Sequence, residues 1–203
     1  MRYPSHKFKA ILKSCRPRQW TKNFIVAAAP IFSLKFDLEI FYATIFSLIC
    51  FCLVSSSIYL LNDSLDINED KIHPIKKYRP IPSGLISIKL AKFTSFLLIF
   101  ISLLIAAFVS NALFLILIVY LIIQFSYCWS LKNKPILDLI CISSGFLLRS
   151  VAGGVASNIF VSPWFLLSIG FLALFLAVEK RKAELVQYEY NGELTRKVLK
   201  RYS

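Results

Sequence analysis

The chain has 203 residues, of which 57% are hydrophobic and 17% charged, and its mean hydropathy is +0.66. This composition is too apolar for a soluble domain and indicates a polytopic membrane protein. The formal net charge of +13 does not point to nucleic acid, because the basic residues lie between hydrophobic segments. The five cysteines form no Cys-x-x-Cys pair, so neither a disulfide framework nor a zinc site is expected.

The first 22 residues form a basic arm that we expect to lie on an anionic membrane surface. The arm runs into the motif RPRQWTKN, residues 16–23, in which Trp20 suits a membrane interface. The apolar run Phe24–Leu34 that follows is short for a span. The first helix is therefore expected to begin within the motif and to run along protein rather than lipid.

Five longer apolar segments give six expected spans in a single all-α membrane domain covering residues 1–203. They are Ile40–Leu61, Leu90–Val109, Ala112–Trp129, Ile136–Ala156 and Trp164–Val178. With this arrangement, 22 of the 24 Lys and Arg residues fall on one side. The positive-inside rule then predicts a multi-pass membrane protein with both termini in the cytoplasm. The connections 62–89 and 130–138 and the tail 179–203 share that side.

Four acids follow the second expected span, in the stretch NDSLDINEDKIHPIKKYRPIPSG, residues 62–84. If the helix continues, Asp63, Asp66 and Asp70 share one face, with Asn62 one turn before Asp66. Carboxylates near a helix C-terminus oppose the macrodipole by about 0.3–1 kcal/mol each, so a cation should compensate them. Mg²⁺, which commonly binds through carboxylates and substrate phosphates, fits this pattern. The alternative is a solvated charged loop without a ligand.

Basic residues follow the acids, and they could hold the remaining phosphate oxygens. They are Lys76, Lys77 and Arg79. A similar but weaker pattern follows the fourth span, where YCWSLKNKPILD places a tyrosine, a lysine and an aspartate at the same membrane edge. These are Tyr127, Lys132 and Asp138.

Arg149 is an ionisable residue inside the fifth expected span. A charge at this depth is costly in lipid and usually faces a cavity or a partner. Arg149 is thus a candidate contact for a lipid phosphate or a supporting residue, and the alternative is a purely structural pairing. Lys180 and Arg181 follow the last span; they could face a donor substrate, although a topology marker explains them equally well.

These motifs resemble a known family. NDSLDINED resembles the Asn-Asp-x-x-Asp-x-x-x-Asp signature of the UbiA superfamily of intramembrane prenyltransferases. The continuation DKIHPIKKYRPIPSG, the motif RPRQWTKN and residues 127–138 are similar to its decaprenyl-phosphate phosphoribosyltransferase branch. The wider superfamily usually carries a second aspartate four residues after Asp138, where this chain has Ile142. That departure favours the phosphoribosyl branch.

The resemblance implies Mg²⁺-dependent transfer of 5-phosphoribosyl from phosphoribosyl pyrophosphate to a polyprenyl phosphate in the membrane, a step of cell wall biosynthesis. It implies Asp63, Asp66 and Asp70 as metal ligands, with Asp138 as a further catalytic carboxylate. The expected substrate contacts are Arg16, Lys22, Asn62, Lys76, Lys77, Arg79, Tyr127, Lys132, Arg149, Lys180 and Arg181.

Two other functions stay open. One is a prenyltransferase that uses a polyprenyl pyrophosphate and an aromatic acceptor. The other is an inactive or non-enzymatic membrane protein, since the family typically has nine membrane helices and six are expected here. We therefore expect the C-terminal third to be lacking, with a longer chain or a second polypeptide completing the bundle. A six-helix arc would expose Arg149 to lipid, at about 2.5–3.5 kcal/mol or more.

Overall fold

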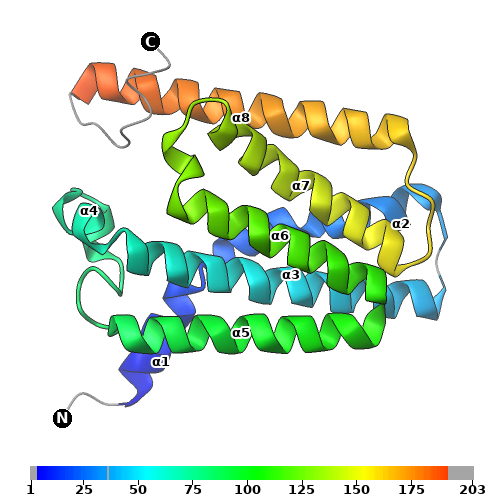
Figure 1. Cartoon of the computed structure of the whole chain (residues 1–203), viewed down its shortest axis with the longest axis horizontal. Coiled ribbons are helices and arrows are strands. Elements are labelled where there is room, and N and C mark those ends of the chain that lie inside the picture. The colour runs from blue at the N-terminus through cyan, green and yellow to red at the C-terminus, as the bar shows by residue number, and fades with distance from the viewer. Residues whose placement is uncertain (1–3, 36, 192–203) are drawn as a thin grey trace.

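The computed structural model describes residues 4–35 and 37–191, and the chain in these ranges is helical (Figure 1). The expected all-α class is confirmed. The elements are α1 (Pro4–Ser14), the 3₁₀ helix η1 (Pro17–Ala27), α2 (Ala28–Ser33), α3 (Leu38–Leu65), α4 (Ile67–Ile72), η2 (Lys76–Tyr78), α5 (Ile88–Val109), α6 (Asn111–Trp129), η3 (Leu131–Asn133), α7 (Leu137–Ala156) and α8 (Pro163–Asn191). About half of the expected tail, residues 192–203, lies outside the described part.

In the part of the chain that the structure describes, five helices are long and apolar enough to cross a membrane, namely α3, α5, α6, α7 and α8. They match five of the six expected spans, and the chain is a multi-pass membrane protein. The first expected span instead consists of η1 followed by the short α2. Pro30 has no backbone N–H to donate to the carbonyl of Val26, so the α-helical hydrogen-bond ladder cannot run through this point.

The helix starts are fixed by polar caps. Asp37 accepts a hydrogen bond from the Ile40 amide at 2.8 Å and begins α3. Ser87 and Ser110 cap α5 and α6 in the same way, accepting from the Leu90 and Ala112 amides. Such caps satisfy amides that the first helical turn leaves unpaired. They explain why the hydrophobic runs become separate helices with short connections.

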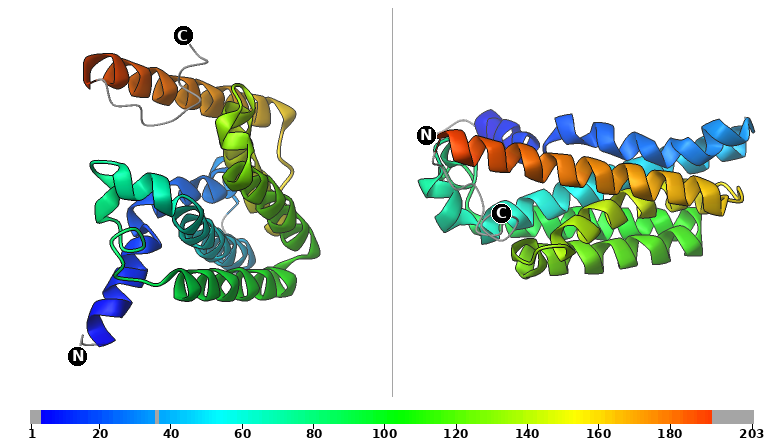
Figure 2. Two further views of the ribbon diagram at one scale, coloured as in Figure 1. Left: turned by 60° about the vertical axis from the view of Figure 1, so that its left-hand side comes forward. Right: turned by 90° about the horizontal axis from the view of Figure 1, so that it is seen from above.

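Seen along the bundle, α5, α6, α7 and α8 follow one another around an open arc, and α3 with η1 lies on its inner side (Figure 2). Serines let α5 approach α3 closely: Ser95 Oγ donates to the Ser57 carbonyl and Ser102 Oγ to the Cys50 carbonyl, at 2.9 and 3.0 Å. Small polar residues of this kind stabilise helix pairs in membranes. We call the end where α1 and α4 lie, on the left of Figure 1, the polar end.

Gly153 lets α7 touch the backbone of η1. A Cβ added at Gly153 would lie 1.7 Å from the Val26 carbonyl oxygen, whereas one at Gly170 of α8 would meet Leu147 Cδ2 at an ordinary 3.5 Å. We expect Gly153→Ala to lower the free energy of unfolding by about 1–3 kcal/mol or more, because η1 must move away, and this loss should appear as a lower midpoint of thermal unfolding in detergent. Gly170→Ala is the matched control. Equal midpoints for the two variants would show that η1 yields without cost.

Candidate functional site

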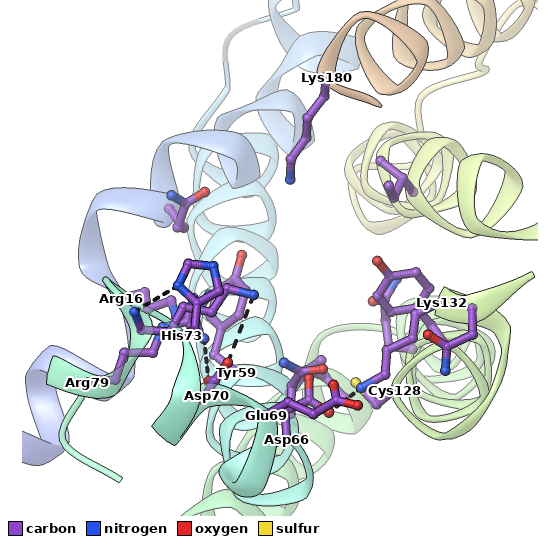
Figure 3. A pocket seen from close by; sticks show the side chains of 18 of the residues that line it. Arg16, Tyr59, Asp66, Glu69, Asp70, His73, Arg79, Cys128, Lys132 and Lys180 are labelled. Atoms are coloured by element: carbon purple, nitrogen blue, oxygen red, sulfur yellow. Dashed lines mark hydrogen bonds and ion pairs between the residues drawn. The ribbon is translucent and has the colours of Figure 1, made fainter. Parts of the chain in front are cut away.

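A pocket of about 1180 Å³ opens at the polar end (Figure 3). Its walls come from η1, α3, α4 and the loop after it, α6, η3, α7 and α8. Six of the lining residues are Lys or Arg and three are Asp or Glu, which leaves an excess of positive charge. They are Arg16, Lys22, Lys76, Arg79, Lys132 and Lys180, with Asp66, Glu69 and Asp70. Such a pocket suits a ligand with several negative charges.

One wall of the same pocket is apolar. Its hydrophobic side chains are Ile58, Ile142, Phe146, Leu176 and Ala177. Most of them come from α7 and α8, while the acids come from α3 and α4. In Figure 3, Lys180 extends from α8 into the pocket across from Asp66 and Glu69. The pocket thus offers a charged region and an apolar region, which suits a pair of ligands that together have charged and apolar parts.

The acidic motif does not form one continuous helix, so this part of the prediction is wrong. The helix α3 ends at Leu65, and Asp66 occupies its C-cap with φ −89° and ψ 13°. A new helix, α4, begins at Ile67. This change of direction separates Asp63 from Asp66, and Asp63 is not among the residues that line the large pocket.

Asp63 and Asp70 share a guanidinium. Asp63, only 1% exposed, accepts from Arg16 Nη2 at 2.5 Å and from Arg79 Nη1 at 3.1 Å. Arg79 Nη1 also donates to Asp70 Oδ2 at 2.8 Å, and Lys76 Nζ lies 3.9 Å from Asp70 Oδ1. Asp63 therefore positions Arg16 and Arg79, and both of these basic residues reach the pocket.

Asp70 is the acid whose protonation the fold alters. Burial raises the pKa of its carboxyl above the ordinary value, while the charges of Arg79 and Lys76 act in the opposite direction. The negative charge of Asp63 raises it further. Losing or turning away Arg79 would therefore leave Asp70 as a buried carboxylate without its strongest partner.

Asp66 forms an ion pair with Lys132 of η3, which joins the first acidic motif to the second motif across the pocket. The pair is part-buried, so it is stronger than a fully exposed one. Asn62, one turn before Asp66, lines the same pocket. The structure thus brings together Asn62, Asp66, Asp70 and Lys132, all expected site residues from separate parts of the sequence.

Among the described residues, no three His, Cys, Asp or Glu side chains lie close enough to hold a metal ion. The predicted three-aspartate cluster is therefore not preformed, because each aspartate is held by a basic side chain. The oxygen donors facing the pocket are the carboxylates of Asp66, Glu69 and Asp70 and the amide of Asn62. These hard oxygen ligands fit Mg²⁺, which commonly uses one or two carboxylates and fills its other positions with phosphate oxygens and water.

Asp138 does not line the pocket, contrary to its predicted catalytic role. It is fully buried, and Arg181 of α8 donates to both of its oxygens at 2.5 and 3.0 Å. Tyr127 Oη donates to Asp138 Oδ1 at 3.1 Å, and Arg181 also contacts Glu184. Arg181 is likewise absent from the lining. Lys180, the neighbour of Arg181, and Tyr127 do line the pocket, so the ion pair between Arg181 and Asp138 positions these two residues.

Arg149 is also placed away from the pocket lining, so a direct phosphate contact is not formed here. It is only 7% exposed, and the expectation that it would face lipid is wrong. Its guanidinium donates to Asn23 Oδ1, the Gly145 carbonyl and Tyr120 Oη at 2.8, 2.6 and 2.9 Å. Lys77 is a further predicted contact outside the lining; its ammonium lies over the ring of Tyr78.

Sequence reasoning missed several lining residues. They include Gln19, Glu69, Gln124, Cys128 and Phe146. Gln19 lies three residues before Lys22 in η1, and a helix with three residues per turn places both on one side. That spacing is visible in the sequence only if the 3₁₀ conformation is known. Gln124 and Phe146 lie within hydrophobic spans and carry no distinguishing pattern.

Comparison with known proteins agrees with this geometry. The model of the UbiA prenyltransferase family matches residues 24–190. The chain belongs to the UbiA prenyltransferase family. It is 40% identical over 205 residues to the decaprenyl-phosphate phosphoribosyltransferase of Mycolicibacterium smegmatis, covering 98% of this chain and 64% of that protein. The enzyme of the same name from Mycobacterium tuberculosis is 38% identical over 98% of this chain and 68% of its own length.

The fold is also that of solved members of the family. A UbiA homolog from Archaeoglobus fulgidus bound to DMAPP and Mg²⁺ superposes with a TM-score of 0.76 at 23% identity, over 92% of this chain and 67% of that one. This likeness concerns the fold. The chain spans about two thirds of the length of these relatives. The comparisons do not support the expectation of a second polypeptide.

Proposed function

We propose that this protein transfers a 5-phosphoribosyl group from phosphoribosyl pyrophosphate to a polyprenyl phosphate. The observation that carries the proposal is the pocket in which six basic residues and three carboxylates meet an apolar wall. A water-soluble polyanion and a lipid phosphate can meet in such a pocket. Relatives 37–40% identical over 98% of the chain carry the name decaprenyl-phosphate phosphoribosyltransferase, which supports this choice of substrates.

The charged region would hold the pyrophosphate of the donor. Lys132, Lys76 and Arg79 are paired with Asp66 and Asp70. Asp66 and Asp70 would hold Mg²⁺, and their basic partners could then turn to the phosphate oxygens and make charge-assisted hydrogen bonds. Binding of the donor and the metal would thus replace the existing ion pairs of Asp66 and Asp70 with new contacts. Each ligand should therefore favour binding of the other.

In the reaction, the bond between the anomeric carbon of ribose and the pyrophosphate oxygen breaks, and pyrophosphate leaves with the electron pair. An oxygen of the lipid phosphate forms the new bond to that carbon. Because the lipid phosphate is already an anion, no strong general base is needed. Lys132 and Arg79 stabilise the charge that develops on the leaving group. Bound Mg²⁺ supplies further neutralisation of that charge. The apolar wall from α7 and α8 would hold the first part of the polyprenyl chain.

The prenyltransferase alternative is less well supported by the pocket. According to the resemblance, members of the wider superfamily carry two aspartates on this segment, where this chain has Asp138 and Ile142. Asp138 is occupied by Arg181, and Ile142 presents an apolar side chain to the pocket. Among the described residues, the carboxylates that line this pocket therefore come from the first motif, with none from α7.

We further infer that the polar end faces the cytoplasm of a bacterial inner membrane. The support is the distribution of basic residues, with 22 of 24 on the side that carries this pocket. Phosphoribosyl pyrophosphate is a soluble anion, so a pocket that opens to the cytoplasm can take it up directly.

The proposal is tested with membranes containing the full chain, supplied with either labelled phosphoribosyl pyrophosphate and decaprenyl phosphate or labelled polyprenyl pyrophosphate and an aromatic acid. We expect a labelled phosphoribosyl lipid only in the first arm, and only with Mg²⁺. The Mycolicibacterium smegmatis relative is the positive control. Product in the second arm alone would establish the prenyltransferase alternative. Turnover by the control with none by this chain would favour a non-enzymatic role.

A further inference from the structure

The buried guanidinium of Arg149 bonds to groups that carry no charge. Its acceptors are the Asn23 amide oxygen, the Gly145 carbonyl and the Tyr120 hydroxyl. Among the residues that the structure describes, no carboxylate forms a salt bridge with it. The rings of Tyr120, Phe51 and Phe146 lie 5.0, 5.6 and 5.9 Å from its central carbon and stabilise the charge in part. A hydrophobic residue would avoid this desolvation cost, so the role of Arg149 lies in what its hydrogen bonds hold.

Its longest-range partner is Asn23 of η1, which is fully buried. The Asn23 amide nitrogen lies 3.3 Å from both Ser55 Oγ and Cys52 Sγ of α3. One side chain of η1 is therefore held between α3 and α7 by its two ends. Removing Arg149 would leave the Asn23 oxygen buried without this donor, a cost that movement of η1 would relieve.

A second contact fixes the same two helices one turn further along. The Val26 carbonyl of η1 lies against Gly153 of α7, so closely that no Cβ fits there. From Arg149 to Gly153, four residues of α-helix rise about 6 Å. From Asn23 to Val26, three residues of 3₁₀ helix also rise about 6 Å, whereas an α-helix would rise about 4.5 Å. Both contacts can therefore form together when η1 has the 3₁₀ conformation.

That conformation decides which residues of η1 reach the pocket. A 3₁₀ helix has about three residues per turn, so side chains three apart lie one above another. Gln19 and Lys22 have this spacing within η1, and both line the pocket together with Arg16, the residue that precedes the helix as its N-cap. In an α-helix, each step of three residues would turn the side chain by about 60° relative to the previous one, and the row would diverge.

We infer that Arg149 is a positioning residue: through Asn23 it holds η1 in the 3₁₀ conformation that aligns Gln19 and Lys22 along the pocket, next to the N-cap residue Arg16, as a row for phosphate oxygens. The identity of the anion rests on the proposed function, but the hold on η1 does not. Arg149 acts without touching the ligand. Its removal should displace η1 and weaken anion binding together.

Trp20 gives a reporter within η1, because its indole donates to Ser56 Oγ of α3 at 3.0 Å. The other two tryptophans, Trp129 and Trp164, are 86% and 78% exposed and can be replaced by phenylalanine. In this single-tryptophan background, acrylamide quenching reports the exposure of Trp20. Calorimetry with inorganic pyrophosphate and Mg²⁺ reports the pocket, and circular dichroism verifies that the helices remain.

We expect Arg149→Leu and Asn23→Ala each to raise quenching of Trp20 at least twofold and to weaken pyrophosphate binding by about tenfold or more, since small displacements of binding groups are costly. Tyr120→Phe is the matched control, because it removes a hydrogen bond from the same guanidinium without touching η1. Asn23→Asp keeps an acceptor for Arg149 and should stay near the parent. If Arg149→Leu does not fold, the two Asn23 variants carry the test.

Unchanged Trp20 quenching in both Arg149→Leu and Asn23→Ala overturns the positioning role. Weakened pyrophosphate binding with unchanged quenching also overturns it, and would indicate direct contact of Arg149 with phosphate. Increased quenching with unchanged affinity overturns the assignment of the row to phosphate. A parent protein that binds no pyrophosphate would contradict the proposed function, while the quenching series would still decide whether Arg149 holds η1.

Discussion

Asp66→Asn is expected to abolish the Mg²⁺-dependent part of donor binding, a loss of about 100-fold or more in the affinity for phosphoribosyl pyrophosphate with Mg²⁺ present. Asp66 lines the pocket and presents one of its three carboxylates. Without Mg²⁺ the affinity should not fall, because the substitution releases Lys132 from its ion pair. Titration calorimetry on the purified protein, with and without Mg²⁺, measures both values.

Two further variants sharpen this result. Asp63→Asn should lower thermal stability and weaken binding with and without Mg²⁺ to a similar degree, because Asp63 holds Arg16 and Arg79 rather than facing the pocket. Glu39→Gln, at the opposite end of α3 and exposed, is the control for losing a carboxylate. If Asp63→Asn removes only the Mg²⁺-dependent part, the metal is bound by Asp63 and the site is misplaced.

Asp138→Asn is expected to destabilise the protein by about 3–5 kcal/mol, because it leaves the buried guanidinium of Arg181 without its bidentate partner. The measurement is denaturant unfolding in detergent, followed by the loss of helical signal. Glu179→Gln, an exposed neighbour on α8, should change stability by less than about 0.5 kcal/mol.

A paired substitution separates structure from chemistry at this position. Replacing Asp138 and Arg181 together by leucine should recover much of the lost stability, since hydrophobic residues often substitute well for a buried ion pair. If Asp138→Asn keeps its stability and loses only turnover, Asp138 acts in the reaction. The structure instead indicates that it fixes α7 to α8, beside Lys180.

Five of the six expected spans and the family could be predicted because both depend on local signals. Hydrophobic length located α3, α5, α6, α7 and α8, and the spacing of the acids indicated the family. The break at Asp66 could not be predicted: no glycine or proline lies between Asn62 and Ile72 to mark it. The chain changes direction there while Asp66 pairs with Lys132, which is distant in the sequence.

The partners within the ion pairs could not be predicted from the sequence either. The sequence shows acids and bases near one membrane edge, but it does not show that Asp63 takes Arg16 while Asp138 takes Arg181. Arg149 was recognised as unusual because of its depth in a span. Its partner Asn23 lies 126 residues away and belongs to another helix, so its role appears only in the folded structure.

The most direct test is a crystal structure of the protein with Mn²⁺ and phosphoribosyl pyrophosphate, in which anomalous scattering locates the metal in place of Mg²⁺. We predict one or more Mn²⁺ ions coordinated by Asp66 or Asp70 inside the pocket, with the donor pyrophosphate contacting Lys132 and Arg79. Mn²⁺ bound at Asp63 outside the pocket, or a donor bound away from these basic side chains, would contradict the proposed site and the reaction derived from it.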